Sequence, residues 1–180
     1  MELNIMKVLT FAASSSSKSI NKTLASYAAS LVKGAEVEVL DINDYEMPLF
    51  SEDKEAILGQ PKEAKAFYEK ITEADALIIS FAEHNGSYTA AYKNLFDWTS
   101  RINQKLFQNK PMVLLATSPG PGGAASVLNT AVTSAPYFNG DVKASLSIPS
   151  FYDNFDMDNQ KITSPSILEE LTQAVASLTK

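Results

Sequence analysis

Five short, mostly apolar runs are separated along the chain by longer stretches with apolar residues at helical spacing. The apolar runs predict strands at residues 6–12, 36–40, 76–81, 112–117 and 142–148. The longer stretches predict helices at residues 20–32, 61–72, 89–102, 124–135 and 166–178. Strands that alternate with helices in this way favour right-handed βαβ units. We therefore expect an α/β fold, with a parallel sheet covered by helices on both faces.

The number of predicted strands also indicates how they are ordered. Five strands and five helices fit the doubly wound order 2-1-3-4-5, with a switch point between strands one and three. No repeat or change of composition divides the sequence, so residues 1–180 are expected to form a single domain. Segments 42–60 and 151–155 fall outside the pattern, and we expect both to be surface excursions above the sheet.

Composition narrows the possible chemistry. The absence of cysteine excludes disulfides, thiol nucleophiles, iron–sulfur clusters and cysteine zinc sites, and a single histidine leaves no ordinary histidine metal cage. A net charge of −6 argues against a broad surface for nucleic acid or an anionic membrane. The N-terminus has too few apolar residues for a signal peptide, and no segment reaches the roughly 18 apolar residues of a membrane span. We expect a cytoplasmic protein without a metal site.

A serine-rich loop follows the first predicted strand. Residues 13–21 read ASSSSKSIN and lead directly into the first predicted helix. Hydroxyls and main-chain N–H groups at a helix N-terminus bind phosphate, and the helix dipole adds attraction. A flexible linker or an ordinary helix cap could have the same composition. The position between the first strand and first helix of an α/β pattern favours phosphate binding.

A second polar loop follows the strand at 76–81. Residues 83–88 read EHNGSY, and the Asn-Gly pair permits left-handed backbone, so main-chain N–H groups can face a flat ligand. Asn-Gly is also a signal for a β-hairpin, but the helical spacing of residues 89–102 argues against a returning strand. His84 is either part of a site or an exposed loop residue without a function, and the sequence leaves both open.

A third loop, SPGPGGA at residues 118–124, follows the fourth predicted strand. Its glycines allow a ligand to approach the backbone closely, although the pattern is neither a Walker loop nor a GxGxxG fingerprint. Taken alone, it could be a plain strand-to-helix turn. Because the carboxyl ends of parallel strands lie at one edge of the sheet, all three loops are expected to form one ligand site there.

These residues resemble those of the NADPH-dependent FMN reductase family, flavodoxin-like enzymes that include azoreductases, quinone reductases and chromate reductases. EHNGSY and the following KNLFDW at 93–98 match the family's PEYNGS turn and LKNxxDW helix at the same spacing, with Ala82 at the proline and His84 at the tyrosine. Ser14, Ser19 and Asn21 match its GSxRxxSxN phosphate loop, with Ala13 at the glycine and Ser16 at the arginine. Lys18 can compensate for that arginine as a point charge. The resemblance extends from residue 7 into the last predicted helix.

The resemblance implies a flavodoxin-like fold that binds FMN, takes a hydride from NADPH or NADH, and reduces a small acceptor. That acceptor would be a flavin, quinone, azo compound or metal oxyanion. The flavin carries this chemistry, so no catalytic side chain is expected. A non-enzymatic electron carrier and a flavin-free interaction module of the same fold stay open as alternatives. The residues expected to bind the cofactor are Ser14, Ser16, Ser19, Ile20, Asn21, Glu83, His84, Asn85, Gly86, Ser87, Tyr88, Ser118, Gly120, Gly122 and Gly123.

The predicted helix at 89–102 is apolar over more of its surface than one core-facing stripe requires. We expect its second apolar side to be buried against a second copy, in a homodimer or homotetramer. The resemblance points the same way, because flavin sites in the family commonly lie near the subunit interface. Coverage by segments 42–60 or 151–155 is the alternative. The apolar positions are Ala91, Tyr92, Leu95, Phe96, Trp98 and Ile102.

Overall fold

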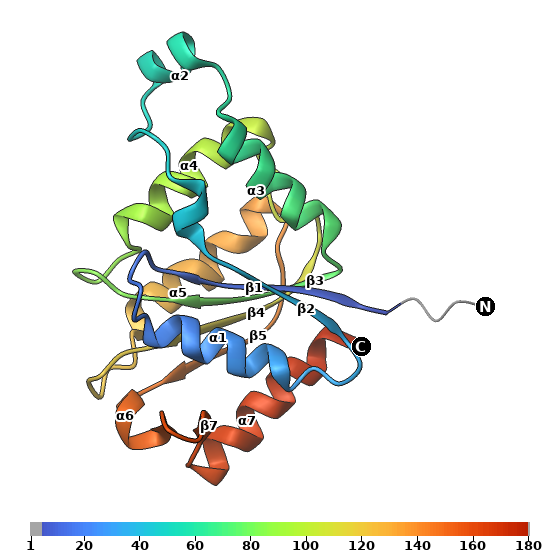
Figure 1. Cartoon of the computed structure of the whole chain (residues 1–180), viewed down its shortest axis with the longest axis vertical. Coiled ribbons are helices and arrows are strands. Elements are labelled where there is room, and N and C mark those ends of the chain that lie inside the picture. Colours follow the sequence, from blue (N-terminus) through green and yellow to red (C-terminus); the bar gives the residue numbers. More distant parts are fainter. Residues whose placement is uncertain (1–4, 180) are drawn as a thin grey trace.

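The computed structural model describes residues 5–179 and is built on a five-stranded parallel sheet. The strand order β2-β1-β3-β4-β5 confirms the predicted doubly wound topology (Figure 1). Neighbouring strands run parallel throughout, with one register shift between β4 and β5. The strands are β1 (Lys7–Ala13), β2 (Glu36–Leu40), β3 (Ala76–Phe81), β4 (Pro111–Thr117) and β5 (Asp141–Ile148).

Helices cover both faces of the sheet, and each face has its own apolar core. Along β1, Val8 packs with α1 and α7 on one face, whereas Leu9 and Phe11 pack with α3, α4 and α5 on the other. This division follows from the two-residue period of a strand. The helices are α1 (Ile20–Ser30), α3 (Lys62–Glu73), α4 (Ala90–Ile102), α5 (Ala125–Ser134) and α7 (Pro165–Ala176), with short 3₁₀ turns η2 (Ala135–Phe138) and η3 (Ser177–Thr179).

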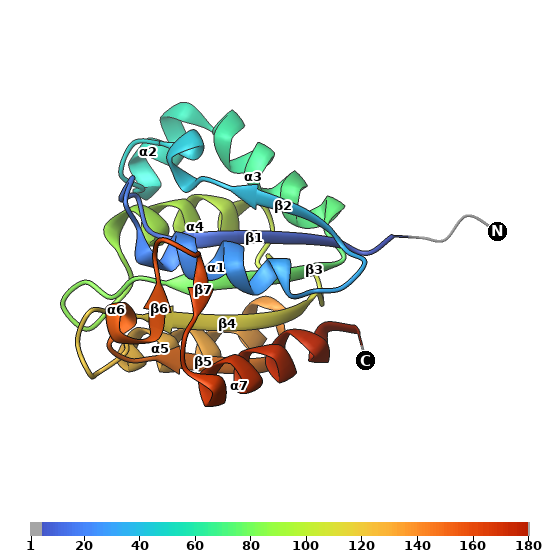
Figure 2. The ribbon, with the colours of Figure 1, turned by 60° about the horizontal axis from the view of Figure 1, so that its bottom comes forward.

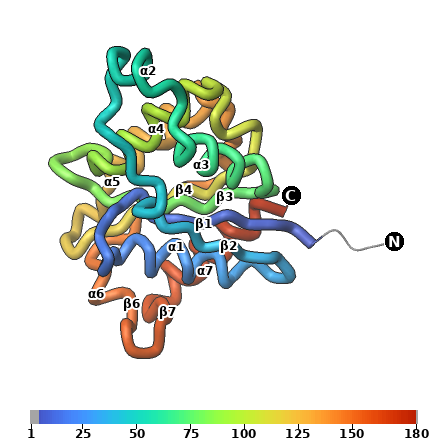
Figure 3. Tube along the Cα trace, turned by 45° about the horizontal axis from the view of Figure 1, so that its top comes forward, coloured from blue at the N-terminus to red at the C-terminus, as the bar shows by residue number. Residues whose placement is uncertain are grey.

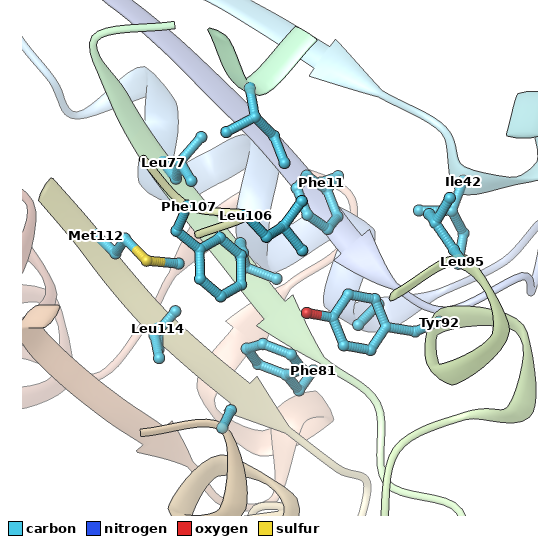
Figure 4. Close-up of a cluster of buried hydrophobic side chains, with 14 of the residues drawn as sticks. Phe11, Ile42, Leu77, Phe81, Tyr92, Leu95, Leu106, Phe107, Met112 and Leu114 are labelled. Atoms are coloured by element: carbon cyan, nitrogen blue, oxygen red, sulfur yellow. The ribbon is translucent and has the colours of Figure 1, made fainter. Parts of the chain in front are cut away.

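The larger core lies between the sheet and the three helices α3, α4 and α5. Figure 4 shows Phe81 of β3 beside Tyr92 of α4, with Leu114 of β4 nearby. The Phe81 and Tyr92 rings meet edge to face at 5.4 Å, and Phe11 meets Phe67 at 5.5 Å in the same way. Such packing fixes α4 against the sheet and therefore fixes the loop that precedes it.

The segment between β2 and α3 forms the 3₁₀ turn η1 (Ile42–Tyr45) and helix α2 (Glu52–Leu58), which projects from the body in Figure 1. Its base covers the second side of α4: Trp98 donates its indole N–H to the Pro48 carbonyl at 2.7 Å, and Phe50 packs on the same indole ring. Phe96 packs instead on Phe138 at 4.7 Å. Segment 42–60 thus covers Trp98, as in the alternative left open by the sequence, whereas Phe96 is covered by Phe138, which lies in neither of the two segments considered.

The prediction that residues 151–155 form a surface excursion is wrong for two of its aromatic residues. Phe151 and Phe155 are buried, and their rings stack at 4.9 Å in the core beneath α1 and α7. Only Tyr152, with 61% of its surface exposed, matches the expectation among the three aromatics. The segment forms the short helix α6 (Phe151–Asn154) and leads into a hairpin of β6 (Phe155–Asp156) and β7 (Lys161–Ile162).

Within residues 5–179, no helix combines the length and apolarity that crossing a membrane requires.

Candidate functional site

The three loops singled out in the sequence meet at the carboxyl edge of the sheet, at the left of Figure 1. They enclose an open cleft of about 250 Å³, to which α6 contributes one side. This is the edge at which ligands bind in open α/β sheets. The cleft is lined by Ser14, Ser16, Lys18, Ser19, Ile20, Asn21, Ala82, Glu83, His84, Thr117, Ser118, Pro119 and Tyr152.

The start of α1 presents a set of unpaired main-chain donors to the cleft. Ser19 caps the helix by accepting a hydrogen bond from the N–H of Lys22 at 3.2 Å. Ser14 likewise accepts the N–H of Ser16 at 3.2 Å. Both hydroxyls therefore keep their own O–H to donate. The main-chain N–H groups of Ser17, Lys18, Ile20 and Asn21 have no hydrogen-bond acceptor among the described residues. This is the donor arrangement that binds a phosphate at a helix N-terminus.

The side chain of Asn21 points into the protein. Its Nδ2 donates to the Thr117 carbonyl at 3.1 Å, and its Oδ1 accepts the Thr117 N–H at 3.1 Å and the Ser80 hydroxyl at 2.7 Å. The side chain is 2% exposed, so these bonds are shielded from water. Asn21 therefore joins the start of α1 to the ends of β3 and β4, and its main-chain N–H is the group left to meet a ligand.

Residues 84–87 form a tight two-residue turn. The N–H of His84 donates to Ser87 O at 3.0 Å, and the N–H of Ser87 donates to His84 O at 3.1 Å. Asn85 and Gly86 both have positive φ, at 52° and 75°, as the Asn-Gly pair predicts. The turn has hairpin geometry but leads into α4. Of its main-chain donors, those of Asn85 and Gly86 have no acceptor within the described residues.

Glu83 holds the second and third loops together. Its carboxylate accepts the N–H of Val127, in the first turn of α5, at 2.9 Å. The third loop approaches β5 so closely that a side chain at Gly123 would collide with the Ser147 hydroxyl, and Gly123 has a φ of +58°. Ser147 donates to the Gly123 carbonyl at 2.8 Å. The loop glycine therefore meets both a backbone and a packing requirement.

Several of the expected site residues do not line the cleft in the described structure. Tyr88 turns its ring toward Phe81 and Tyr92, and its hydroxyl lies 3.2 Å from that of Ser134. Partial burial raises the pKa of Tyr88 above its ordinary value, and the hydrogen bond with Ser134 opposes that shift. The other expected residues outside the lining are Asn85, Gly86, Ser87, Gly120, Gly122 and Gly123. The roles of all seven in cofactor binding stay predictions.

Five lining residues were not among those expected to bind the cofactor: Lys18, Ala82, Thr117, Pro119 and Tyr152. Lys18 is exposed beside the free N–H groups of α1. Tyr152 reaches the cleft because α6 is tied to the third loop: the N–H groups of Ser150 and Phe151 donate to the carbonyls of Gly120 and Ser118, at 2.9 and 3.0 Å. The sequence signals the aromatic run at 151–155 but not these long-range backbone contacts.

The charges around the cleft suit an anionic ligand. In the described lining, Glu83 is the one carboxylate, and the Val127 N–H partly balances its charge. Asp41 lies next to α1, where it accepts a hydrogen bond from Lys22 at 2.5 Å. That bond, with support from the Asn43 N–H, lowers the pKa of Asp41. A phosphate at the start of α1 therefore meets Lys18, hydroxyls and N–H groups, a donor set that fits the phosphate of FMN.

Comparison with known proteins shows the family of the chain. Residues 6–151 match the model of the NADPH-dependent FMN reductase family. The chain belongs to this family. One relative is an NAD(P)H-dependent FMN reductase of Pseudomonas aeruginosa, 38% identical over 67% of the chain and 64% of that protein. A 2-hydroxy-1,4-benzoquinone reductase of Burkholderia is 34% identical over the same shares. The matched regions thus span slightly less than two thirds of these two relatives.

Solved structures of other proteins share the fold. The flavoenzyme NAD(P)H:(acceptor) oxidoreductase FerB from Paracoccus denitrificans superposes with a TM-score of 0.76, at 24% identity over 97% of this chain and 95% of its own. An azoreductase from Bacillus anthracis superposes with a TM-score of 0.61, at 18% identity over 98% of this chain and all of its own. At these identities the likeness establishes the flavodoxin-like fold of this member of the FMN reductase family.

Proposed function

We propose that this FMN reductase family member is an NAD(P)H-dependent flavoprotein oxidoreductase that binds FMN in the cleft at the carboxyl edge of the sheet. The observation that carries the proposal is the convergence of the three loops on one cleft whose phosphate end is built from unpaired N–H groups. When bound, FMN would supply the redox chemistry, accepting a hydride from NADPH or NADH and reducing a flavin, quinone, azo compound or metal oxyanion.

The residues of the chain bind and orient in this proposal. The hydroxyls of Ser14, Ser16 and Ser19 donate hydrogen bonds to the phosphate, and Lys18 adds a positive charge. The flavin ring would lie between the 84–87 turn and the third loop, where the N–H groups of Asn85 and Gly86 can donate to it. We propose that His84 and the glycines of the third loop also contact the flavin ring.

A homodimer or homotetramer also stays a proposal, but the surface that supports it has changed. Because the chain itself covers much of α4, its apolar residues no longer require a partner copy. The arm around α2 instead exposes Leu49, Ile57 and Leu58, which are 71%, 81% and 54% accessible. Exposed apolar side chains on this segment suit a contact between two copies. The cytoplasmic location expected from the sequence likewise stays a prediction.

The first experiment is FMN binding to flavin-free protein, measured by quenching of flavin fluorescence. Ser16→Ala removes one hydroxyl of the phosphate site and should weaken FMN binding by about tenfold, since a hydrogen bond to a charged group is worth about 1.5 kcal/mol. Ser15→Ala is the matched control, because Ser15 lines a different hollow beside α4. Equal FMN affinity in both variants would contradict binding of the FMN phosphate by this loop.

The second experiment is steady-state oxidation of NADPH and NADH by the FMN-loaded protein with an added quinone or free flavin. Turnover is expected for the enzyme proposed here. A protein that binds FMN but turns over negligibly would be an electron carrier. A colourless protein that does not take up FMN would be a flavin-free interaction module, and the proposal would fail.

A further inference from the structure

A second hollow, larger than the cleft, opens beside it between α1 and the β6–β7 hairpin. Figure 2 shows the hairpin standing in front of α1. The volume of this groove is about 500 Å³, within the range of small-molecule sites. Lys18, Ser19, Ile20 and Tyr152 line both hollows, so the groove continues from the phosphate end of the cleft. Its other lining residues are Ser17, Lys22, Thr23, Ser26, Met157 and Gln160.

The hairpin wall of the groove is firmly anchored. The stacked rings of Phe151 and Phe155 hold its base in the core, and Tyr27 of α1 packs edge to face on Phe155 at 5.5 Å. Ile162 is buried against α7 in the same core. In the trace of Figure 3 the β6–β7 hairpin projects from the body of the protein. Tyr152 and Met157 therefore lie one and two residues after a buried aromatic anchor.

The two walls differ in chemistry. Along α1 the groove has two lysines, Lys18 and Lys22, and four hydroxyl side chains. The opposite wall presents the ring of Tyr152 from α6 and the thioether of Met157 from the hairpin turn, which are 61% and 42% exposed. In the described structure no carboxylate lines the groove. The nearby Asp156 accepts hydrogen bonds from its own turn. Because Lys22 is paired with Asp41 at 2.5 Å, Lys18 is the cation of the described lining that has no carboxylate partner, and the groove faces it with an aromatic side.

We propose that this groove binds the adenosine phosphate of a dinucleotide whose redox-active ring lies in the cleft. The inference rests on the proposed function for the position of the flavin phosphate at the start of α1. A ligand that extends beyond that phosphate enters the groove directly. A second phosphate then meets Lys18 and the hydroxyl side chains along the groove, and the flat purine stacks on Tyr152 beside the Met157 sulfur. Two dinucleotides have this chemistry: FAD, and the hydride donor NAD(P)H.

ADP is the probe for the groove, with binding measured by calorimetry on the full chain with and without FMN. Met157→Ala removes part of the hairpin wall of the groove without touching the cleft, and Tyr152→Ala removes the stacking ring. Each should weaken ADP binding, Tyr152→Ala at least fivefold, whereas Tyr152→Phe should retain it. Tyr137→Ala is the control, because Tyr137 is 76% exposed but lies in η2 and lines neither hollow. Undetectable ADP binding, or equal binding by all variants, overturns the proposal.

Two further measurements distinguish the sources of the adenosine. If the groove holds the adenylyl part of FAD, Met157→Ala should raise the ratio of the FAD and FMN dissociation constants at least threefold, without changing that of FMN. If it holds NAD(P)H, ADP should bind the FMN-loaded protein, and Met157→Ala should raise the KM for NADPH but not for reduced nicotinamide mononucleotide. ADP binding with neither effect overturns the dinucleotide proposal. Failure of FMN binding would defeat the proposed function, whereas the ADP titration would still test the groove.

Discussion

Replacing Asn21 by alanine tests whether this residue acts on the fold or directly on a ligand. The side chain makes three hydrogen bonds with the ends of β3 and β4 and is almost completely buried. At about 1 kcal/mol for each hydrogen bond, Asn21→Ala should lower the free energy of unfolding by about 3 kcal/mol. Ser80 and Thr117 lose their partners, and water entering from the cleft can replace them only in part.

The assay is thermal and urea unfolding of the flavin-free protein, in which a ligand contact cannot contribute. A loss of about 3 kcal/mol corresponds to a fall in Tm of roughly 6–12 °C for a chain of this length. Asn129→Ala is the control, since Asn129 is exposed on α5 and its side chain has no hydrogen bond among the described residues. Its Tm should stay within about 1–2 °C of the parent protein, as for most surface substitutions.

Coupling to Ser80 provides the stricter criterion. Ser80→Ala removes the donor of the 2.7 Å bond to Asn21, so the double variant should lose less stability than the two single losses added together. A coupling energy of about 0.5–3 kcal/mol is expected for residues in one network. The reasoning is refuted if Asn21→Ala costs less than about 1 kcal/mol in the flavin-free protein, because three hydrogen bonds cannot be worth so little. Additive losses would refute the pairing with Ser80.

Two other predictions concern the third loop and the assembly. Gly123→Ala should destabilise the protein by about 2–4 kcal/mol, because it forces a left-handed residue and a clash with Ser147, whereas Gly122→Ala has open space and no positive φ and should change little. Equal urea midpoints for the two variants would contradict this. If the arm around α2 joins two copies, Ile57→Asp should halve the mass from light scattering while Phe96→Leu does not. A parent mass near the 19.5 kDa of one chain excludes the dimer.

The sequence predicts the sheet well because each strand is defined by its own residues. Runs 36–40 and 76–81 coincide with β2 and β3, and the remaining strands differ from prediction by one residue at either end. The α/β alternation then restricts the topology to a few choices. Helix ends shift by up to two residues, because caps such as Ser19 and Thr89 decide where a helix begins.

Short elements were missed because distant residues stabilise them. Helix α2 has seven residues, none of them buried, and the β6–β7 hairpin has two residues in each strand. No periodic pattern can appear over such lengths. The burial of Phe151 and Phe155 depends on α1 and α7, which the local sequence does not place. An aromatic run therefore looked like a surface feature although two of its rings belong to the core.

In the candidate site, too, the local sequence does not predict contacts between distant residues. The three loops were found from their composition, but the side-chain partners were not, because Asn21 bonds Thr117 across 96 positions and Glu83 bonds Val127 across 44. These two polar side chains had been assigned to the cofactor. In the structure their hydrogen bonds fasten one loop to the next, a role that residue type alone does not distinguish from ligand binding.

These bonds give side chain and backbone different roles: the side chains connect the loops, and the main-chain N–H groups are left to bind a ligand. Asn21 and Glu83 hold the loops in place, so the unpaired main-chain N–H groups at the start of α1 are fixed beside the cleft before a ligand arrives. Such donors cannot be removed by substituting one side chain. Variants of Asn21 and Glu83 should therefore weaken ligand binding through the stability and spacing of the loops, and variants of Ser16 and Lys18 through direct contact. Measuring unfolding and FMN affinity on the same variants separates the two causes.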